Sequence, residues 1–245
     1  MSEKTAPLFY PGRSLSAAPA ADTRSSPLIR PYRPEDRAAV RKICCDTGFL
    51  GRPIDTIFRD RELFADLLTS LYLDYEPEWA LVVEHEGEVV GYLLASVSRI
   101  FALNQLRCGF ATVCRMLKRL AAGGYDDHPR SRRYVRWVLT AGCRERPRHP
   151  ASAAHLHFNL IESCRGRFLG KHLWDAFDQR LRAAGIKEVY GEFYSYPGRR
   201  PERAYARYGF SVFDRRQTTL FWPEIADPVE VVCALRQVPT DPVDD

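Results

Sequence analysis

The sequence predicts an α+β fold, in which strands and amphipathic helices follow one another along a single chain. Three observations predict this fold class. Residues 154–161 alternate between apolar and polar side chains, which is the period of a strand with one apolar face. Residues 169–182 instead carry apolar side chains at helical spacing. The chain has 245 residues, 45% of them hydrophobic, so it can bury a sizeable core as one domain with elaborations.

The N-terminal part contains a tail and a helix that the residue pattern predicts directly. Residues 1–27 are rich in Ser, Ala and Pro and lack a continuous apolar run, so we expect a disordered tail rather than a signal peptide. A helix is predicted to begin at Arg59-Asp60-Arg61-Glu62, because apolar residues follow at helical spacing: Phe64, Leu67, Leu68, Leu71 and Tyr72. We assign these side chains to packing.

Residues 154–185 predict a strand, a glycine-containing loop and a helix in immediate succession. The strand directs Leu156, Phe158 and Leu160 to one face and His155, His157 and Asn159 to the other. The loop contains Gly166 and Gly170, and Gly185 ends the helix, whose apolar face is formed by Leu173, Trp174, Phe177 and Leu181.

The start of that helix is a candidate anion site. Its first N–H groups have no partner within the helix, and the helix dipole places about half a positive charge there. Arg165, Arg167 and Lys171 add charge around the same turn, so a polyvalent anion such as a pyrophosphate is the expected ligand. The alternative is an ordinary strand, turn and helix with a basic surface.

Three further elements are predicted downstream. Residues 187–194 form another strand, and a turn at Pro197 and Gly198 leads to a short helix that begins at Pro201. Residues 211–222 form the next strand, and residues 229–235 are a candidate last element.

These segments resemble the GNAT superfamily of acyl-CoA N-acyltransferases. The loop resembles the central motif of that family, Arg or Gln, two residues, Gly, one residue, Gly or Ala, and here it consists of Arg165, Gly166, Arg167, Phe168, Leu169 and Gly170. Phe168 stands where the family prefers its first glycine. The family often has a second motif, a tyrosine followed after three residues by Gly-Phe, which Tyr205, Gly209 and Phe210 match. Its frequent asparagine before the short helix is missing, and Gly198 lies near that position.

The resemblance covers residues 28–97 and 151–222 and implies the rest of the fold. Residues 28–48, with a helix start at Pro34-Glu35-Asp36, resemble the opening strand and helix, and residues 79–96 resemble the second and third strands. A mixed, mostly antiparallel central sheet flanked by helices is expected, with a helical insertion between the third and fourth strands. We therefore expect an N-acetyltransferase domain at residues 28–222, with residues 98–150 as the insertion and residues 223–245 as a C-terminal extension.

The resemblance also implies a co-substrate and its binding residues. Acetyl-CoA is expected to place its pyrophosphate on the N–H groups of a seven-residue segment and its pantetheine arm against the strand edge at Leu160 and Ile161. The seven residues are Arg165, Gly166, Arg167, Phe168, Leu169, Gly170 and Lys171.

An amine acceptor is then expected to attack the thioester directly, which requires a proton donor for the thiolate and a base for the amine. Tyr205 is the expected donor, the alternative being a core aromatic residue. Glu192 is the first candidate for the base, ahead of His157, Glu162 or a water chain. A second function class stays open because of Phe168 and the missing asparagine, namely a degenerate, non-catalytic module that binds a ligand or partner through its basic insertion.

The insertion is strongly basic. Residues 98–150 contain twelve Lys or Arg and three acids, a local balance of +9 in a chain of net charge +5. Residues 103–120 have helical periodicity, and residues 131–139 predict a second helix. These helices are expected to wall the acceptor site, or else to form a solvated cap. Nucleic acid is not an expected partner, because aromatic residues do not interleave with the charges.

The remaining features exclude several classes. No run of 18 apolar residues exists, so no span and no membrane partner are expected. Seven cysteines without a CxxC pair favour a reducing, cytoplasmic setting, and Cys164 is expected to be a filler residue rather than a nucleophile. His155, His157 and Glu192 could in principle hold zinc, but further ligands are not evident, so no metal is expected.

Overall fold

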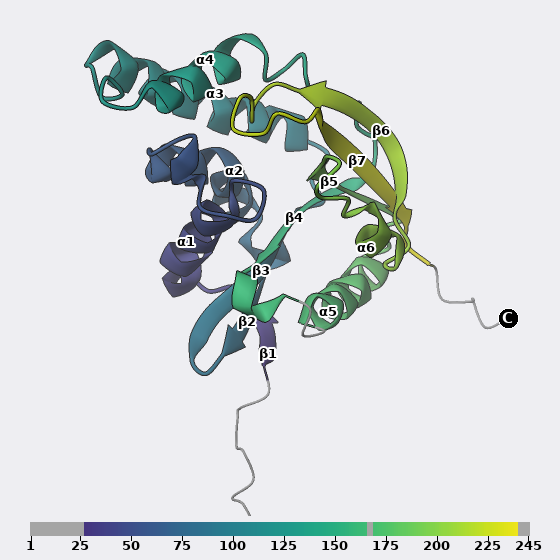
Figure 1. Ribbon diagram of the computed structural model, residues 1–245. Helices are drawn as coiled ribbons and strands as arrows, with labels where there is room; N and C mark the ends of the chain where they lie inside the picture. The colour runs from purple at the N-terminus through teal and green to yellow at the C-terminus, as the bar shows by residue number, and fades with distance from the viewer. Residues whose placement is uncertain (1–26, 166–168, 240–245) are drawn as a thin grey trace, which may run out of the picture.

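The computed structural model describes residues 27–165 and 169–239, which form a seven-stranded sheet with helices on both faces (Figure 1). The strand order is β1-β2-β3-β4-β5-β7-β6. Neighbouring strands are antiparallel, except that β4 and β5 are parallel. The predicted α+β fold with a mixed, mostly antiparallel sheet is therefore confirmed. The strands are β1 (Leu28–Pro31), β2 (Leu81–His85), β3 (Glu88–Ser96), β4 (Ala154–Leu160), β5 (Glu188–Ser195), β6 (Ser211–Thr218) and β7 (Val229–Gln237).

Two helices precede the central strands. The 3-10 turn Pro34–Asp36 leads into α1 (Arg37–Thr47), at the predicted helix start. The next helix, α2 (Arg61–Tyr75), follows the 3-10 turn Ile54–Thr56. Asp60 caps α2 by accepting the N–H of Leu63 at 3.2 Å, as an acidic residue before a helix is suited to do.

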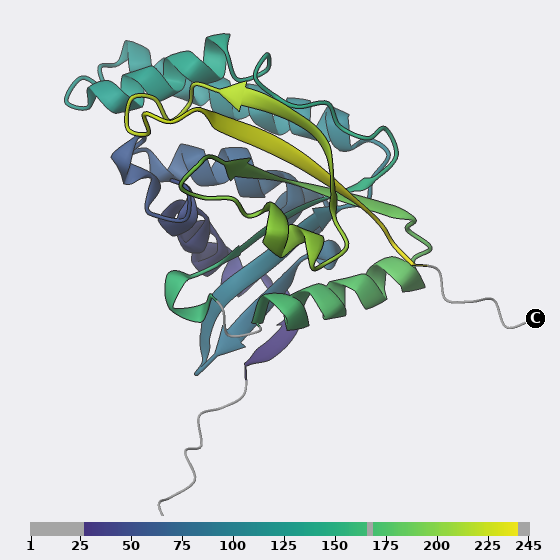
Figure 2. The ribbon, with the colours of Figure 1, turned by 45° about the vertical axis from the view of Figure 1, so that its right-hand side comes forward.

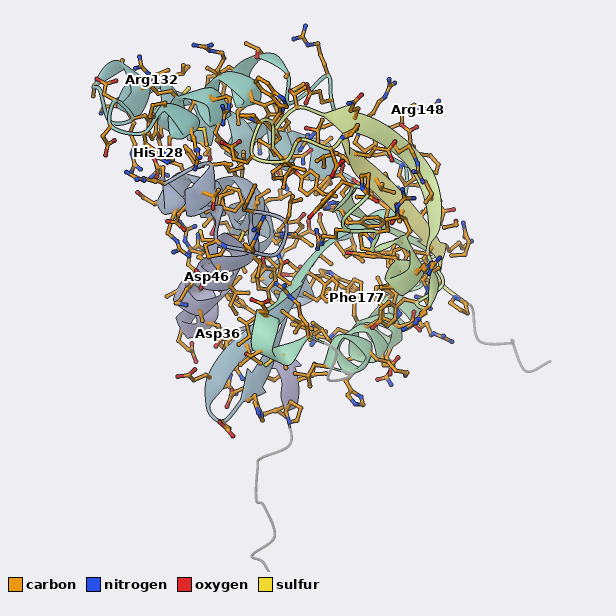
Figure 3. The ribbon with its side chains drawn as sticks, viewed as in Figure 1. Asp36, Asp46, His128, Arg132, Arg148 and Phe177 are labelled. Carbon is orange, nitrogen blue, oxygen red and sulfur yellow. The ribbon has the colours of Figure 1, made fainter. Side chains whose placement is uncertain are left out.

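The hairpin of β2 and β3 shows how the two faces of the sheet are built. Its turn uses positive φ angles at Glu86 (53°) and Gly87 (80°), which match the twist of a two-residue hairpin. Successive residues then pack on opposite faces: Tyr92 belongs to the core beside α1 and α2, and Leu93 to the core beside α5 (Leu169–Ala183). Phe177 of α5 points into that second core (Figure 3). The turned view shows α5 running along its face of the sheet (Figure 2).

The basic insertion is helical, as expected. It consists of α3 (Phe101–Ala121) and α4 (Pro129–Thr140), between β3 and β4. Within the insertion, α3 packs on α2, and residues beyond α4 reach β6, where the Arg148 N–H donates to Asp214 at 2.6 Å. The periodic apolar residues of α3 are largely exposed, whereas a periodic stripe usually faces the core.

The C-terminal strand β7 lies inside the sheet, between β5 and β6. It falls within residues 223–245, the range predicted as an extension, so that range contributes a strand to the same sheet. Val232 and Cys233 are fully buried on its two faces, which explains why this segment is a nearly continuous apolar run. The short helix α6 (Glu202–Ala206) connects β5 to β6.

Candidate active site

The parallel strands β4 and β5 separate after a short paired stretch. Ala154, His155 and Leu156 pair with Val189, Tyr190 and Gly191. Beyond these pairs β4 continues to Leu160 and β5 to Ser195 without further pairing between them. Gly191 stands at the last pair, where a Cβ atom would come within 3.0 Å of the Leu156 side chain. The sheet therefore opens into a gap between the carboxyl halves of β4 and β5.

The edge of β4 faces this gap through alternate residues. Ile161 donates its N–H to Val90 of β3 at 3.0 Å, and Asn159 pairs with Tyr92. By the alternation of an antiparallel ladder, the backbone groups of Leu160 face the other way, toward β5. Of the two predicted edge residues, Leu160 thus borders the gap, whereas the Ile161 N–H serves the β3 side.

The connection from β4 to α5 is anchored by Arg165. After the 3-10 turn Glu162–Cys164, the Arg165 guanidinium donates to the carbonyl oxygens of Leu160 and Gly51, both at 3.1 Å. These bonds fasten the connection to the segment after α1. The predicted binding residues Gly166, Arg167 and Phe168 lie outside the described residues.

The three predicted binding residues in the first turn of α5 have different surroundings. Leu169 is buried in the core, so its side chain anchors the helix. At Gly170 an added Cβ would meet the Tyr208 hydroxyl at 3.4 Å, an ordinary contact. Lys171 is exposed and pairs with Asp175 at 2.5 Å. Two of the three cations expected to attract a polyvalent anion, Arg165 and Lys171, therefore already have partners.

Tyr205 lies on the α5 side of the sheet, next to the open half of β5. Its ring stacks on Phe193 with centroids 4.3 Å apart and meets Phe210 edge-on at 5.7 Å. Burial raises the pKa of the Tyr205 phenol to about 12, against a smaller opposing effect of the Arg199 charge. The hydroxyl is therefore protonated at neutral pH, the state that a proton donor requires.

Glu192 lies on the opposite face, because it precedes Phe193 in the same strand. Its carboxylate is 3.2 Å from His149 Nε2 and 4.0 Å from His155 Nε2. Burial alone would raise the pKa of this carboxyl, but the contact with His149 and the charge of Arg146 outweigh it and lower the pKa. Glu192 is thus ionised at neutral pH and able to accept a proton. The two predicted catalytic residues border the gap from its two faces.

The histidines of β4 form a buried polar cluster on the Glu192 side. The Tyr72 hydroxyl is 2.5 Å from His155 Nδ1, and Asn159 Nδ2 is 3.2 Å from His157 Nε2. Burial lowers the pKa of His155 to about 3 and that of His157 to about 4, so both rings are neutral near pH 7. A ring whose pKa lies this far below neutral pH is a weak base.

The remaining candidates are placed away from the gap or in packing. Glu162 is exposed in the 3-10 turn, and Cys164 is buried in the core beside α5. Among residues 27–165 and 169–239, no group of His, Cys, Asp or Glu is arranged to hold a metal ion. No helix in those ranges is long and apolar enough to cross a membrane.

Sequence reasoning missed two members of the Glu192 cluster. His149 lies at the end of the insertion, outside any motif, and Tyr72 counted only as a packing residue of α2. The only signal was the alternation that placed His155 and His157 on one strand face. Nothing in the sequence indicated which helix would cover that face.

No family model and no curated protein matches this sequence. Solved structures do match over most of the chain. SsHAT is 24% identical with a TM-score of 0.55, and the match covers 88% of this chain and 100% of that one. Ard1 from Thermoplasma volcanium is 18% identical with a TM-score of 0.50, and the match covers 88% of this chain and 99% of that one. An N-acetyltransferase from Staphylococcus aureus Mu50 is 11% identical with a TM-score of 0.53, and the match covers 88% of this chain and 100% of that one. The chain therefore has the fold of the GNAT N-acetyltransferases.

Proposed function

We propose that this protein is an N-acetyltransferase that transfers the acetyl group of acetyl-CoA to an amine acceptor. The gap between β4 and β5 carries the proposal, because it joins an open strand edge to the start of α5 within one site. The fold shared with N-acetyltransferases supports it.

The co-substrate would bind along the open edge of β4. Its pantetheine amides would pair with the backbone of Leu160, while its pyrophosphate would accept the N–H groups of the segment from Arg165 through Lys171. Because the Arg165 side chain is already bonded to two carbonyl oxygens, its contribution would be to shape the connection. The helix N–H groups would supply most of the attraction.

Direct attack needs one residue from each face of the gap. The acceptor nitrogen would form a bond to the thioester carbon and give its proton to the Glu192 carboxylate. As the carbon–sulfur bond breaks, the thiolate would take the proton of the Tyr205 hydroxyl, whose raised pKa keeps that proton available. The products are an amide and CoA.

A specific observation favours the alternative of a non-catalytic module. The expected positive charge of the loop is partly neutralised, because Lys171 pairs with Asp175 and Arg165 bonds to Leu160 and Gly51. An exposed pair such as Lys171 and Asp175 is worth only about 0.5 kcal/mol, so a ligand could displace it.

The experiment that separates these functions measures thiol release from acetyl-CoA in the presence of a panel of primary amines. We expect amine-dependent release that Tyr205→Phe slows by about 100-fold, with the affinity for CoA unchanged because the ring still stacks on Phe193. Tyr75→Phe, the same change at an exposed residue of α2, is the matched control. Weaker CoA binding with an intact rate would contradict the role of Tyr205, and no release with any amine would favour the non-catalytic module.

A further inference from the structure

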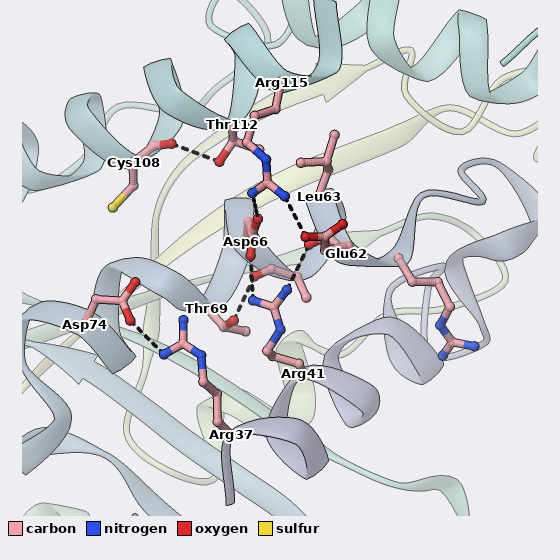
Figure 4. Close-up of polar contacts among 12 residues, drawn as sticks. Arg37, Arg41, Glu62, Leu63, Asp66, Thr69, Asp74, Cys108, Thr112 and Arg115 are labelled. Carbon is pink, nitrogen blue, oxygen red and sulfur yellow. Dashed lines mark hydrogen bonds and ion pairs between the residues drawn. The ribbon is translucent and has the colours of Figure 1, made fainter. Parts of the chain in front are cut away.

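The face through which α3 packs on the protein carries two ion-paired arginines beside its buried residues. Arg115 forms ion pairs with Glu62 and Asp66 of α2 (Figure 4), and Arg119 with Asp60 and Glu62. The buried residues of α3 lie on this side as well, namely Asn104, Thr112 and Met116. Since amphipathic helices usually pack through their apolar stripe, this orientation turns the stripe of α3 away from the core.

The opposite side of α3 carries a row of exposed apolar side chains. Leu106 is 68% exposed and Phe110 is 70% exposed, and the row extends to Leu103 and Leu117. At the rise of an α-helix, positions 103 to 117 span about 21 Å. We call this row the α3 ridge, consisting of the exposed residues Leu103, Leu106, Phe110 and Leu117 and the half-buried Val113 between them. A contiguous exposed apolar row on a protein surface is typical of an interaction site.

Cations border the α3 ridge. Arg107 and Lys118 are exposed and form no ion pair with any residue in the described ranges. No Asp or Glu occurs anywhere in Phe101–Ala121, and residues 98–150 carry a balance of +9. A partner of this surface therefore has to offer an apolar layer and negative charge side by side.

We propose that the α3 ridge docks on an anionic lipid surface. The ridge side chains would enter the outer part of the acyl region, while Arg107 and Lys118 would lie among the phosphate groups, as in helices that rest in the plane of a membrane interface. A second copy of this chain fits less well, because two such helices would bring cations together without any acid between them. Surface docking requires no membrane span, and it is independent of the proposed acetyl transfer.

The test is sedimentation of the full chain with vesicles of phosphatidylcholine and phosphatidylserine in equal parts, against phosphatidylcholine alone. We expect binding to the anionic vesicles only. Leu106→Ser with Phe110→Ser should weaken it at least about tenfold without changing the charge. Arg107→Gln with Lys118→Gln should weaken it about 30-fold at low salt. Lys187→Gln with Arg216→Gln removes two exposed cations elsewhere and should leave binding unchanged.

Several outcomes would overturn the proposal. The unmodified chain could fail to bind anionic vesicles, or it could bind neutral vesicles equally well. The ridge variant could also lose no more vesicle binding than the Lys187 and Arg216 variant. A dimer that forms without vesicles and dissociates in the ridge variant would also overturn it, because a second copy would then occupy the ridge. Circular dichroism melting shows whether each variant is folded. We expect folded variants, because the substituted side chains are exposed.

Discussion

At the scale of single residues, two neighbours in β5 serve opposite faces of the sheet. Glu192 faces the histidines, and the Phe193 ring stacks on Tyr205. Both residues directly follow Gly191, the last residue of β5 that pairs with β4. The alternation of strand side chains thus brings the proposed base and the proposed acid to one gap from two sides. The sequence offered both residues as candidates, but it did not show the contact between His149 and Glu192 or the bond from Arg165 to Gly51, 114 positions away. Such long-range contacts leave no periodic signal.

The buried histidines of β4 predict a loss of stability in mild acid. In the unfolded chain a histidine takes up a proton below its ordinary pKa of 6.5, whereas in the folded protein the pKa is about 3 for His155 and about 4 for His157. The unfolded state therefore binds more protons between these values. The free energy of unfolding should fall as the pH falls from 6.5 toward 4, by about 1.4 kcal/mol per pH unit for each ring.

Urea unfolding at pH 6.5 and pH 5 checks this slope. His157→Gln should reduce it by about 1.4 kcal/mol per pH unit, since one buried titrating ring is removed. His172→Gln, at an exposed residue of α5, should leave the slope unchanged. Equal slopes in the His157 variant and the unmodified chain would show that this ring is protonated in the folded state.

At the scale of secondary structure elements, local patterns predicted where the helices lie in the chain but not which side of α3 faces the core. The helix α5 begins at Leu169 and ends before Gly185, whose φ of 66° suits a glycine after a helix. The same periodicity predicted α3, yet its apolar side is exposed. Ion pairs with α2 hold α3 through its other side, and these involve residues about 50 positions apart.

Gly170 tests the role of the α5 start as a binding element. An alanine Cβ at this position would make only ordinary contacts with Tyr208 and Leu160, so Gly170→Ala should keep both the fold and the affinity for CoA. Gly170→Glu adds bulk and a negative charge next to the proposed pyrophosphate site and should weaken binding by more than about 100-fold. Calorimetry on both variants measures this, and full affinity in the glutamate variant would exclude the site.

The attachment of α3 to α2 predicts unequal losses from two arginines. The side chain of Asp60 is 6% exposed and is paired with Arg119, so Arg119→Gln should leave a buried charge with only neutral donors, at a loss of about 2 to 3 kcal/mol. After Arg115→Gln, Asp66 keeps its bond from Arg41 at 2.6 Å, and the loss should stay below about 1 kcal/mol. Urea unfolding measures both, and equal losses would contradict this ranking.

At the scale of the whole molecule, the fold could be predicted because several elements have local signatures and the resemblance supplied the other elements and their order. The separation of β4 from β5 depends on where their pairing ends, at Leu156 and Gly191, and no residue pattern marks this point. The place of β7 between β5 and β6 was likewise unpredictable, because pairing across a sheet is not local. The proposed binding segment includes residues 166–168, which lie outside the described ranges.

The central claim is that the gap beside the start of α5 binds acetyl-CoA, and titration calorimetry of the full chain tests it most directly. We predict one binding event per chain with a dissociation constant of about micromolar at low salt and weaker binding at high salt, because charge at the pyrophosphate contributes. Absence of binding at either salt concentration would contradict the account and leave a GNAT-like fold without its co-substrate.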